Sequence, residues 1–139
     1  MKVVVDSNII FSALISCKTT YLEIFELAEV YVPDYLLIEV SKYEARINRQ
    51  NKLASALKVF TQALFSQITV IPNLAIDSRS FLKAHSLCKD IDLKDIPFVA
   101  LSIDLSVPLW TDDKALSNGL KAKGYSNVVS STEIFNLVS

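Results

Sequence analysis

The chain has 139 residues, of which 51% are hydrophobic and 21% are charged, and its formal net charge is −1. A chain of this length buries about two thirds of its extended surface on folding, so we expect one soluble globular domain with a full core. No apolar run approaches the roughly 18 residues of a transmembrane helix, which excludes a membrane-spanning protein. The first residues lead into a strand without a signal-peptide pattern, so we expect a cytoplasmic protein with no membrane partner.

Short apolar strands and amphipathic helices alternate along the whole chain. In chain order, strands are predicted near residues 2–6, 29–32, 68–71, 107–111 and 127–130. Helices are predicted near residues 8–15, 19–28, 34–49, 51–65, 77–89, 95–105, 113–123 and 131–138. This alternation predicts right-handed crossovers and a mostly parallel sheet covered on both faces. We therefore expect a single α/β domain over residues 1–139, with α/β/α layers and a sheet of four to five strands.

Several cofactor classes are excluded by residue counts. The glycines, Gly119 and Gly124, are too few for a P-loop or a dinucleotide-binding fingerprint. The single histidine, His85, excludes two-histidine zinc motifs, and two cysteines cannot form a four-thiolate site. Cys17 and Cys88 lie far apart among helix-like residues, so we expect core thiols rather than a disulfide or redox pair.

Charge is divided along the chain although the total is close to zero. Residues 1–39 carry two basic and six acidic side chains, residues 40–89 carry eight and two, and residues 90–139 carry four and seven. A basic middle between acidic flanks suits a polyanion laid across a carboxylate site. Solvated helix faces would give the same counts.

Four acidic residues, Asp6, Glu39, Asp95 and Asp113, each lie beside an apolar segment that should belong to the core. If the predicted strands lie side by side, their carboxyl ends meet at one edge of the sheet, where ligands bind in such folds. Like charges about 4 Å apart repel by roughly 4 kcal/mol at an effective dielectric constant near 20. A converged cluster therefore needs a divalent cation, a raised pKa, or both.

The helix predicted at residues 34–49 combines Glu39 with a basic stripe. Glu39 lies at the edge of the apolar face, and Lys42, Arg46 and Arg49 continue around the same side. One helix could thus offer a carboxylate to a metal and a basic surface to phosphates. Taken alone, the same residues could form only an i,i+3 ion pair between Glu39 and Lys42.

The other candidates also have purely structural interpretations. Asp95 stands where a helix begins, so its carboxylate could be only a cap. One of Asp112 and Asp113 is expected to cap the next helix while the other faces the cleft, and spacing does not decide which. Ser7 and Asn8 could orient the carboxylate of Asp6 or a metal-held water. They could equally form an N-cap and first turn.

Four motifs in order resemble the PIN-domain ribonucleases over essentially the full length of the chain. They are Val3-Val4-Val5-Asp6-Ser7-Asn8-Ile9, then Glu39 early in a helix, then Asp92-Leu93-Lys94-Asp95-Ile96-Pro97-Phe98-Val99-Ala100-Leu101, then Leu109-Trp110-Thr111-Asp112-Asp113-Lys114-Ala115-Leu116. The resemblance implies that the metal ligands for Mg²⁺ or Mn²⁺ are Asp6, Glu39, Asp95 and Asp113. Asp92 and Asp112 are further candidates. The family often has a small residue where this chain has Asp112, so the resemblance leaves open whether Asp112 or Asp113 is the fourth ligand. Thr111 joins Ser7 and Asn8 as a candidate for orienting water or ligand.

The implied function is a metal-dependent endoribonuclease that hydrolyses RNA, with Lys42, Arg46 and Arg49 binding the substrate. Many relatives are toxins of toxin–antitoxin pairs, so an antitoxin protein and a second copy of the chain are candidate partners. The alternative is a PIN-like module that binds RNA or protein without cleaving it. A third class is a phosphoryl-accepting domain with Asp6 as nucleophile. This chain lacks the acidic pair that such a domain would have at its first strand.

Overall fold

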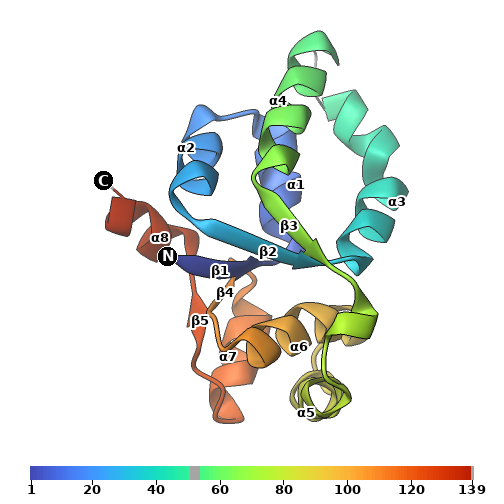
Figure 1. Cartoon of the computed structure of the whole chain (residues 1–139), viewed down its shortest axis with the longest axis vertical. Helices are drawn as coiled ribbons and strands as arrows, with labels where there is room; N and C mark the ends of the chain where they lie inside the picture. The colour runs from blue at the N-terminus through green and yellow to red at the C-terminus, as the bar shows by residue number, and fades with distance from the viewer. Residues whose placement is uncertain (51–53, 139) are drawn as a thin grey trace.

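The computed structural model of the chain describes residues 1–50 and 54–138, and its arrangement is drawn in Figure 1. Within these residues, five strands form one sheet in the order β3-β2-β1-β4-β5, and every neighbouring pair is parallel. The strands are β1 Lys2–Val5, β2 Glu29–Pro33, β3 Ile68–Ile71, β4 Leu109–Trp110 and β5 Val128–Val129. The predicted parallel sheet is confirmed.

The helices follow the predicted alternation. They are α1 Ser7–Ser16, α2 Thr19–Leu27, α3 Tyr35–Gln50, α4 Ala54–Ser66, α5 Ser78–Cys88, α6 Ile96–Leu105, α7 Lys114–Ala122 and α8 Ser131–Val138, with short 3-10 helices η1 Asn73–Ala75 and η2 Leu93–Asp95. The last two were not predicted, because three residues are too few to show a hydrophobic period. Residues 51–53, where the helix predicted at 51–65 would begin, lie outside the described residues.

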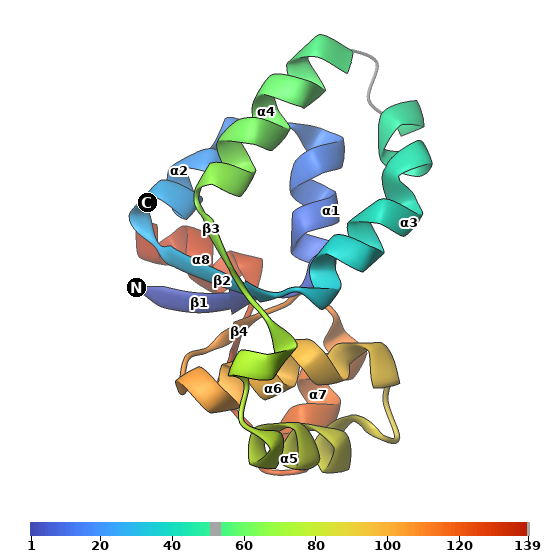
Figure 2. The ribbon, with the colours of Figure 1, turned by 45° about the vertical axis from the view of Figure 1, so that its right-hand side comes forward.

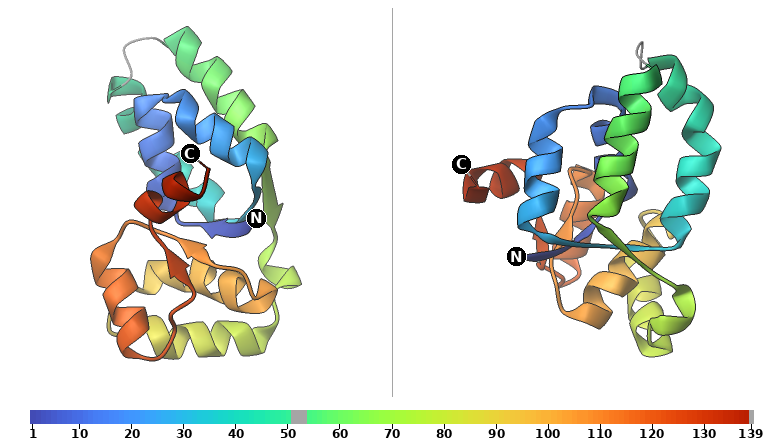
Figure 3. Two further views of the ribbon diagram at one scale, coloured as in Figure 1. Left: turned by 90° about the vertical axis from the view of Figure 1, so that its left-hand side faces the viewer. Right: turned by 45° about the horizontal axis from the view of Figure 1, so that its top comes forward.

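Two helical layers enclose the sheet. Helices α1 to α4 lie on one side, and α5, α6 and α7 lie on the other (Figure 2). The predicted α/β/α class is therefore confirmed. The two views in Figure 3 show the same separation, with α8 beside the edge of the sheet that carries β5. Among residues 1–50 and 54–138, no helix combines the length and apolarity needed to cross a membrane.

The first strand lies at the centre of the sheet and is buried on both faces. Val3, Val4 and Val5 have almost no exposed surface, which is why this strand reads as a continuous apolar run rather than an alternating one. Its neighbour β4 is anchored by Trp110, whose ring is fully buried against Phe25 and Tyr21. The ends of β1 and β4 are thus fixed in place by the packing of the core.

Parallel pairing aligns the ends of these two strands. Val5 pairs with Trp110, and the Asp6 amide donates to the Trp110 carbonyl oxygen at 3.0 Å. Asp6 and Thr111, the first residues after the strands, therefore leave the sheet side by side. This placement follows from the strand register and is the basis of the site described below.

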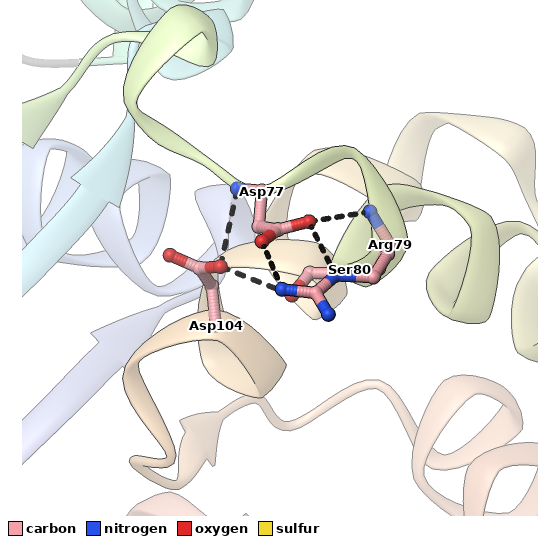
Figure 4. Close-up of polar contacts among 4 residues, drawn as sticks. All are labelled: Asp77, Arg79, Ser80 and Asp104. Carbon is pink, nitrogen blue, oxygen red and sulfur yellow. Dashed lines mark hydrogen bonds and ion pairs between the residues drawn. The ribbon is translucent and has the colours of Figure 1, made fainter.

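In the layer formed by α5, α6 and α7, Asp104 near the end of α6 links two of the helices by hydrogen bonds. Its Oδ1 accepts hydrogen bonds from the Asp77 amide at 3.1 Å and from the Ser80 hydroxyl at 3.0 Å (Figure 4). Asp77 in turn caps α5 by accepting from the Arg79 amide at 2.8 Å. These bonds join the start of α5 to α6, the helix that begins next to Asp95.

Candidate active site

Acidic side chains meet in a pocket of about 420 Å³ at the carboxyl ends of the central strands. The acids that line it come from separate segments of the chain and are Asp6, Glu39, Asp92, Asp95 and Asp113. All four carboxylates of the predicted metal set are thus brought together, along with one of the two further candidates. Ser7 and Asn8 line the same pocket.

Asp6 stands between β1 and α1, with only 2% of its surface exposed. It occupies the N-cap position of α1 but makes no side-chain cap bond. Instead, its Oδ2 accepts a hydrogen bond from the Thr111 hydroxyl at 2.7 Å. Burial raises the pKa of Asp6, and hydrogen bonds from Thr111 and Ser7 oppose this rise. Thr111 and Ser7 therefore act on the carboxylate itself, holding its orientation and favouring its ionised form.

Glu39 approaches from the first part of α3 and is 9% exposed. Burial raises its pKa, the Ser7 hydrogen bond lowers it, and the charge of Asp6 raises it further. Its Oε1 is buried and has no hydrogen-bond partner. Among the residues that the structure describes, no salt bridge joins Glu39 to Lys42, so the interpretation of Glu39 as a simple surface ion pair is wrong.

Asp95 lies at the junction of η2 and α6. It holds the N-cap position of α6 without a side-chain cap bond, and its Oδ2 is buried without a partner. Burial, followed by the charges of Asp6, Asp92, Asp113 and Glu39, raises its pKa to about 7. A helix cap does not account for this carboxylate, so that alternative is wrong.

The two acids after β4 have separate surroundings. The Asp113 Oδ1 caps α7 by accepting from the Leu116 amide at 3.1 Å, and the Asp113 amide donates to the Thr111 hydroxyl oxygen at 3.1 Å. Asp112 turns away from the pocket and accepts from the amide and the hydroxyl of Ser131, at 2.7 and 2.5 Å. The expectation that one acid caps while the other faces the pocket is wrong, because Asp113 does both.

Asp112 is not brought to the pocket because neighbouring side chains in extended backbone point to opposite sides. Asp92 lines the pocket and also caps η2 by accepting from the Lys94 amide at 2.9 Å. Of the predicted basic residues, Arg46 lines the pocket and Lys42 is near enough to lower the pKa of Glu39. Arg49 is exposed in the last turn of α3 and does not line it.

Lys94 lines the pocket and was not singled out from the sequence. Its charge is one of the influences that lower the pKa of Glu39. The signal that could have identified it is its position between Asp92 and Asp95, where a lone basic residue is flanked by two candidate ligands. Without the fold, the same lysine is simply a charged residue in a polar loop.

The donor set of the pocket suits a hard divalent cation. The lining includes five carboxylates and neither histidine nor cysteine, and oxygen donors are what Mg²⁺ and Mn²⁺ prefer. The partnerless oxygens of Glu39 and Asp95 are buried acceptors that a cation would satisfy. However, no three histidine, cysteine or acidic side chains among residues 1–50 and 54–138 are already grouped closely enough to hold one ion.

Comparison with known proteins shows similarity to a family model and to solved structures. The family model described as "PIN domain" matches residues 4–133. A chain from the crystal structure of VapBC2 from Rickettsia felis, bound to a DNA fragment from their promoter, has a TM-score of 0.66 and 15% sequence identity. The similarity covers 94% of this chain and 98% of that chain, and at this identity it concerns the fold. No curated protein sequence matches.

Proposed function

The chain belongs to the PIN-domain family, and from this membership we propose that it is an endoribonuclease that uses Mg²⁺ or Mn²⁺. Members of this family are generally nucleases. The observation that carries the proposal is the pocket in which five acidic side chains meet. Grouped carboxylates repel one another, so a protein that only serves as a scaffold gains no stability from them. A site for a divalent cation, in contrast, requires several carboxylate ligands close together.

The ligands that we assign are Asp6, Glu39, Asp95 and Asp113. Glu39 Oε1 and Asp95 Oδ2 are buried acceptors without a partner, so both can accept a cation without losing a bond within the protein. Asp113 uses Oδ1 for its helix cap, which leaves Oδ2 for the site. A divalent ion held by these oxygens would polarise the scissile phosphate and lower the pKa of a bound water.

The remaining residues orient these groups and attract the substrate. Thr111 and Ser7 hold the Asp6 carboxylate in place. Arg46 and Lys94 line the pocket and would neutralise phosphate charge. Hydrolysis forms a bond from the water oxygen to phosphorus and breaks one phosphorus–oxygen ester bond, which leaves a phosphate monoester and a hydroxyl. No covalent intermediate with the protein is needed.

The similarity to a chain of VapBC2 also supports a proposal about partners. We propose that this chain is the toxin of a toxin–antitoxin pair, with an antitoxin protein and a second copy of the chain as its partners. Co-expression with the product of a neighbouring gene, followed by size-exclusion chromatography, tests this proposal. A chain that stays alone and monomeric would contradict it.

The decisive test of the enzymatic proposal compares wild type with Asp6→Asn on a generic single-stranded RNA. Wild type should cleave in Mg²⁺ or Mn²⁺ and stop in EDTA, while Asp6→Asn should lose cleavage and keep the circular dichroism spectrum of wild type. Glu26→Gln, which neutralises an exposed acid on α2, is the matched control and should cleave normally. Equal cleavage by wild type and Asp6→Asn would end the proposal. RNA binding without turnover would favour the catalytically silent module instead.

A further inference from the structure

The acidic pocket has an apolar wall on the side formed by α1 and α3. Phe11 and Ile15 from α1 and Tyr43 and Ile47 from α3 all line it. The rings of Phe11 and Tyr43 meet edge to face, with centroids 5.2 Å apart and an interplanar angle of 67°. Tyr43 remains 38% exposed. The pocket therefore presents a held aromatic ring to solvent beside the carboxylates.

Helix geometry places the Tyr43 ring about one helical turn from Glu39. Glu39 and Tyr43 are four residues apart on α3, which corresponds to about 6 Å along the helix. Phe11 lies at the matching height on α1, five residues after Asp6. Helices α1 and α3 rise from the sheet next to each other (Figure 2), and they are in contact. A phosphate held at the acids would thus leave an adjacent nucleotide beside Tyr43.

Other aromatic side chains are placed differently. Trp110 is fully buried in the core, and Tyr35 packs edge to face against Phe98, which is also buried. Tyr31 lies on β2 and donates to the side chain of Glu29. None of these three lines the acidic pocket. Tyr43 is therefore the residue whose position beside the acids calls for an explanation other than core packing.

We propose that Tyr43, held by Phe11, is a stacking platform for an unpaired base of the RNA next to the scissile phosphate. This inference rests on the proposed function and adds to it a residue of this chain that contacts a base of the substrate. Bases stack on aromatic rings through either face, and such stacking tolerates any sequence. In a duplex, neighbouring bases already cover both faces, so a paired base cannot reach the platform. Arg46, one turn beyond Tyr43 on α3, also lines the pocket and would hold the phosphate that follows the stacked base.

The test removes the ring and the base in turn. Tyr43→Leu keeps apolar volume without a ring, Tyr43→Phe keeps the ring without the hydroxyl, and Tyr31→Leu is the matched control on β2. Binding is measured in an Asp6→Asn background so that the RNA stays intact, and cleavage is measured with Asp6 present. The RNA is a single-stranded oligonucleotide with an abasic site moved one nucleotide at a time past the cut, and a hairpin pairs the same sequence.

Loss of the stacked base should weaken binding by the Asp6→Asn protein with Tyr43 intact by about tenfold at one abasic position. Tyr43→Leu should lose about the same factor on intact RNA and should no longer respond to that abasic site, since the two changes remove one interaction. Tyr43→Phe and Tyr31→Leu should behave as wild type, and the hairpin should be cut poorly. A ring that only packs α3 against α1 would not produce this loss of response.

Three outcomes overturn the inference. In the first, an abasic site weakens RNA binding equally whether residue 43 is Tyr or Leu. In the second, no position of the abasic site weakens binding by the protein with Tyr43 or by Tyr43→Phe. In the third, the hairpin is cleaved as fast as the single strand. The abasic series on wild type and Tyr43→Phe decides the matter even if Tyr43→Leu misfolds. A protein that binds RNA through Tyr43 but does not cleave it refutes the proposed function alone. A protein that neither binds nor cleaves RNA refutes both proposals.

Discussion

Replacing Asp95 with asparagine should stabilise the metal-free protein at alkaline pH, although it removes a proposed metal ligand. Asp95 is partly buried among other acids, and its Oδ2 has no hydrogen-bond partner. Its pKa is raised from the ordinary value of 3.8 to about 7. Between these pH values the folded chain holds a proton that the unfolded chain has released. The free energy of unfolding of the metal-free protein therefore falls as pH rises from about 4 to about 7.

The magnitude follows from the size of this pKa shift. Full linkage over that interval would lower the free energy of unfolding by about 4 kcal/mol. Asp95 is only partly buried, so solvent screening reduces the expected loss to about 2 kcal/mol. For a domain of this length, that difference corresponds to about 4–8 °C in melting temperature. Asp95→Asn should gain this amount at pH 8.5, and the gain should shrink steadily as pH falls toward 4.

The assay is a series of thermal melts in EDTA between pH 4.5 and pH 8.5 for wild type, Asp95→Asn and Glu26→Gln. Glu26 is exposed on α2, so its neutralisation should not reproduce the effect. Adding Mn²⁺ at pH 8.5 should raise the melting temperature of wild type more than that of Asp95→Asn, because the variant lacks one ligand. A melting temperature of Asp95→Asn that equals or falls below that of wild type at pH 8.5, or a difference independent of pH, would refute this reasoning.

Three further predictions concern groups around the pocket. Thr111→Val removes the hydrogen bond to Asp6, so thermal melts should show a loss of about 1–2 kcal/mol and cleavage should slow, while Thr111→Ser should restore both. Asp112→Asn should weaken the attachment of α8 and lower the melting temperature but leave the cleavage rate unchanged; a loss of cleavage at an unchanged melting temperature would make Asp112 a ligand. Arg46→Ala and Lys94→Ala should each weaken RNA binding and reduce the slope of log affinity against log salt by about one, as measured by fluorescence anisotropy. An unchanged slope in both variants would show that neither residue contacts a phosphate.

The elements of the fold were predictable because their signals are local. The unbroken apolar run at residues 3–5 indicates a strand covered on both faces, and the 3.6-residue period at 34–49 indicates an amphipathic helix. Both assignments are confirmed. The alternation of such segments was enough to predict a parallel sheet between two helical layers. The exceptions, η1 and η2, are three-residue segments without any period.

The acids of the pocket could be identified as candidates from the sequence, since Asp6 and Asp113 each come shortly after a strand. The side chains that surround them could not be predicted. The Thr111 hydroxyl meets the Asp6 carboxylate across a separation of 105 residues, and only the pairing of β1 with β4 brings them together. The local sequence also left Asp112 and Asp113 equivalent. The structure separates them because the two side chains leave the backbone on opposite sides.

The sequence by itself therefore determined the strands, the helices, the class of the fold and the acids worth considering, because each depends on short-range periodicity or on a strand end. The tertiary structure alone decided which acids share a pocket, that Asp95 is a partnerless carboxylate rather than a cap, and that Lys94 and Tyr43 line the same space. These outcomes depend on strand register and on the packing of α1 against α3. Both are set by contacts between residues far apart in the chain, which no local pattern encodes.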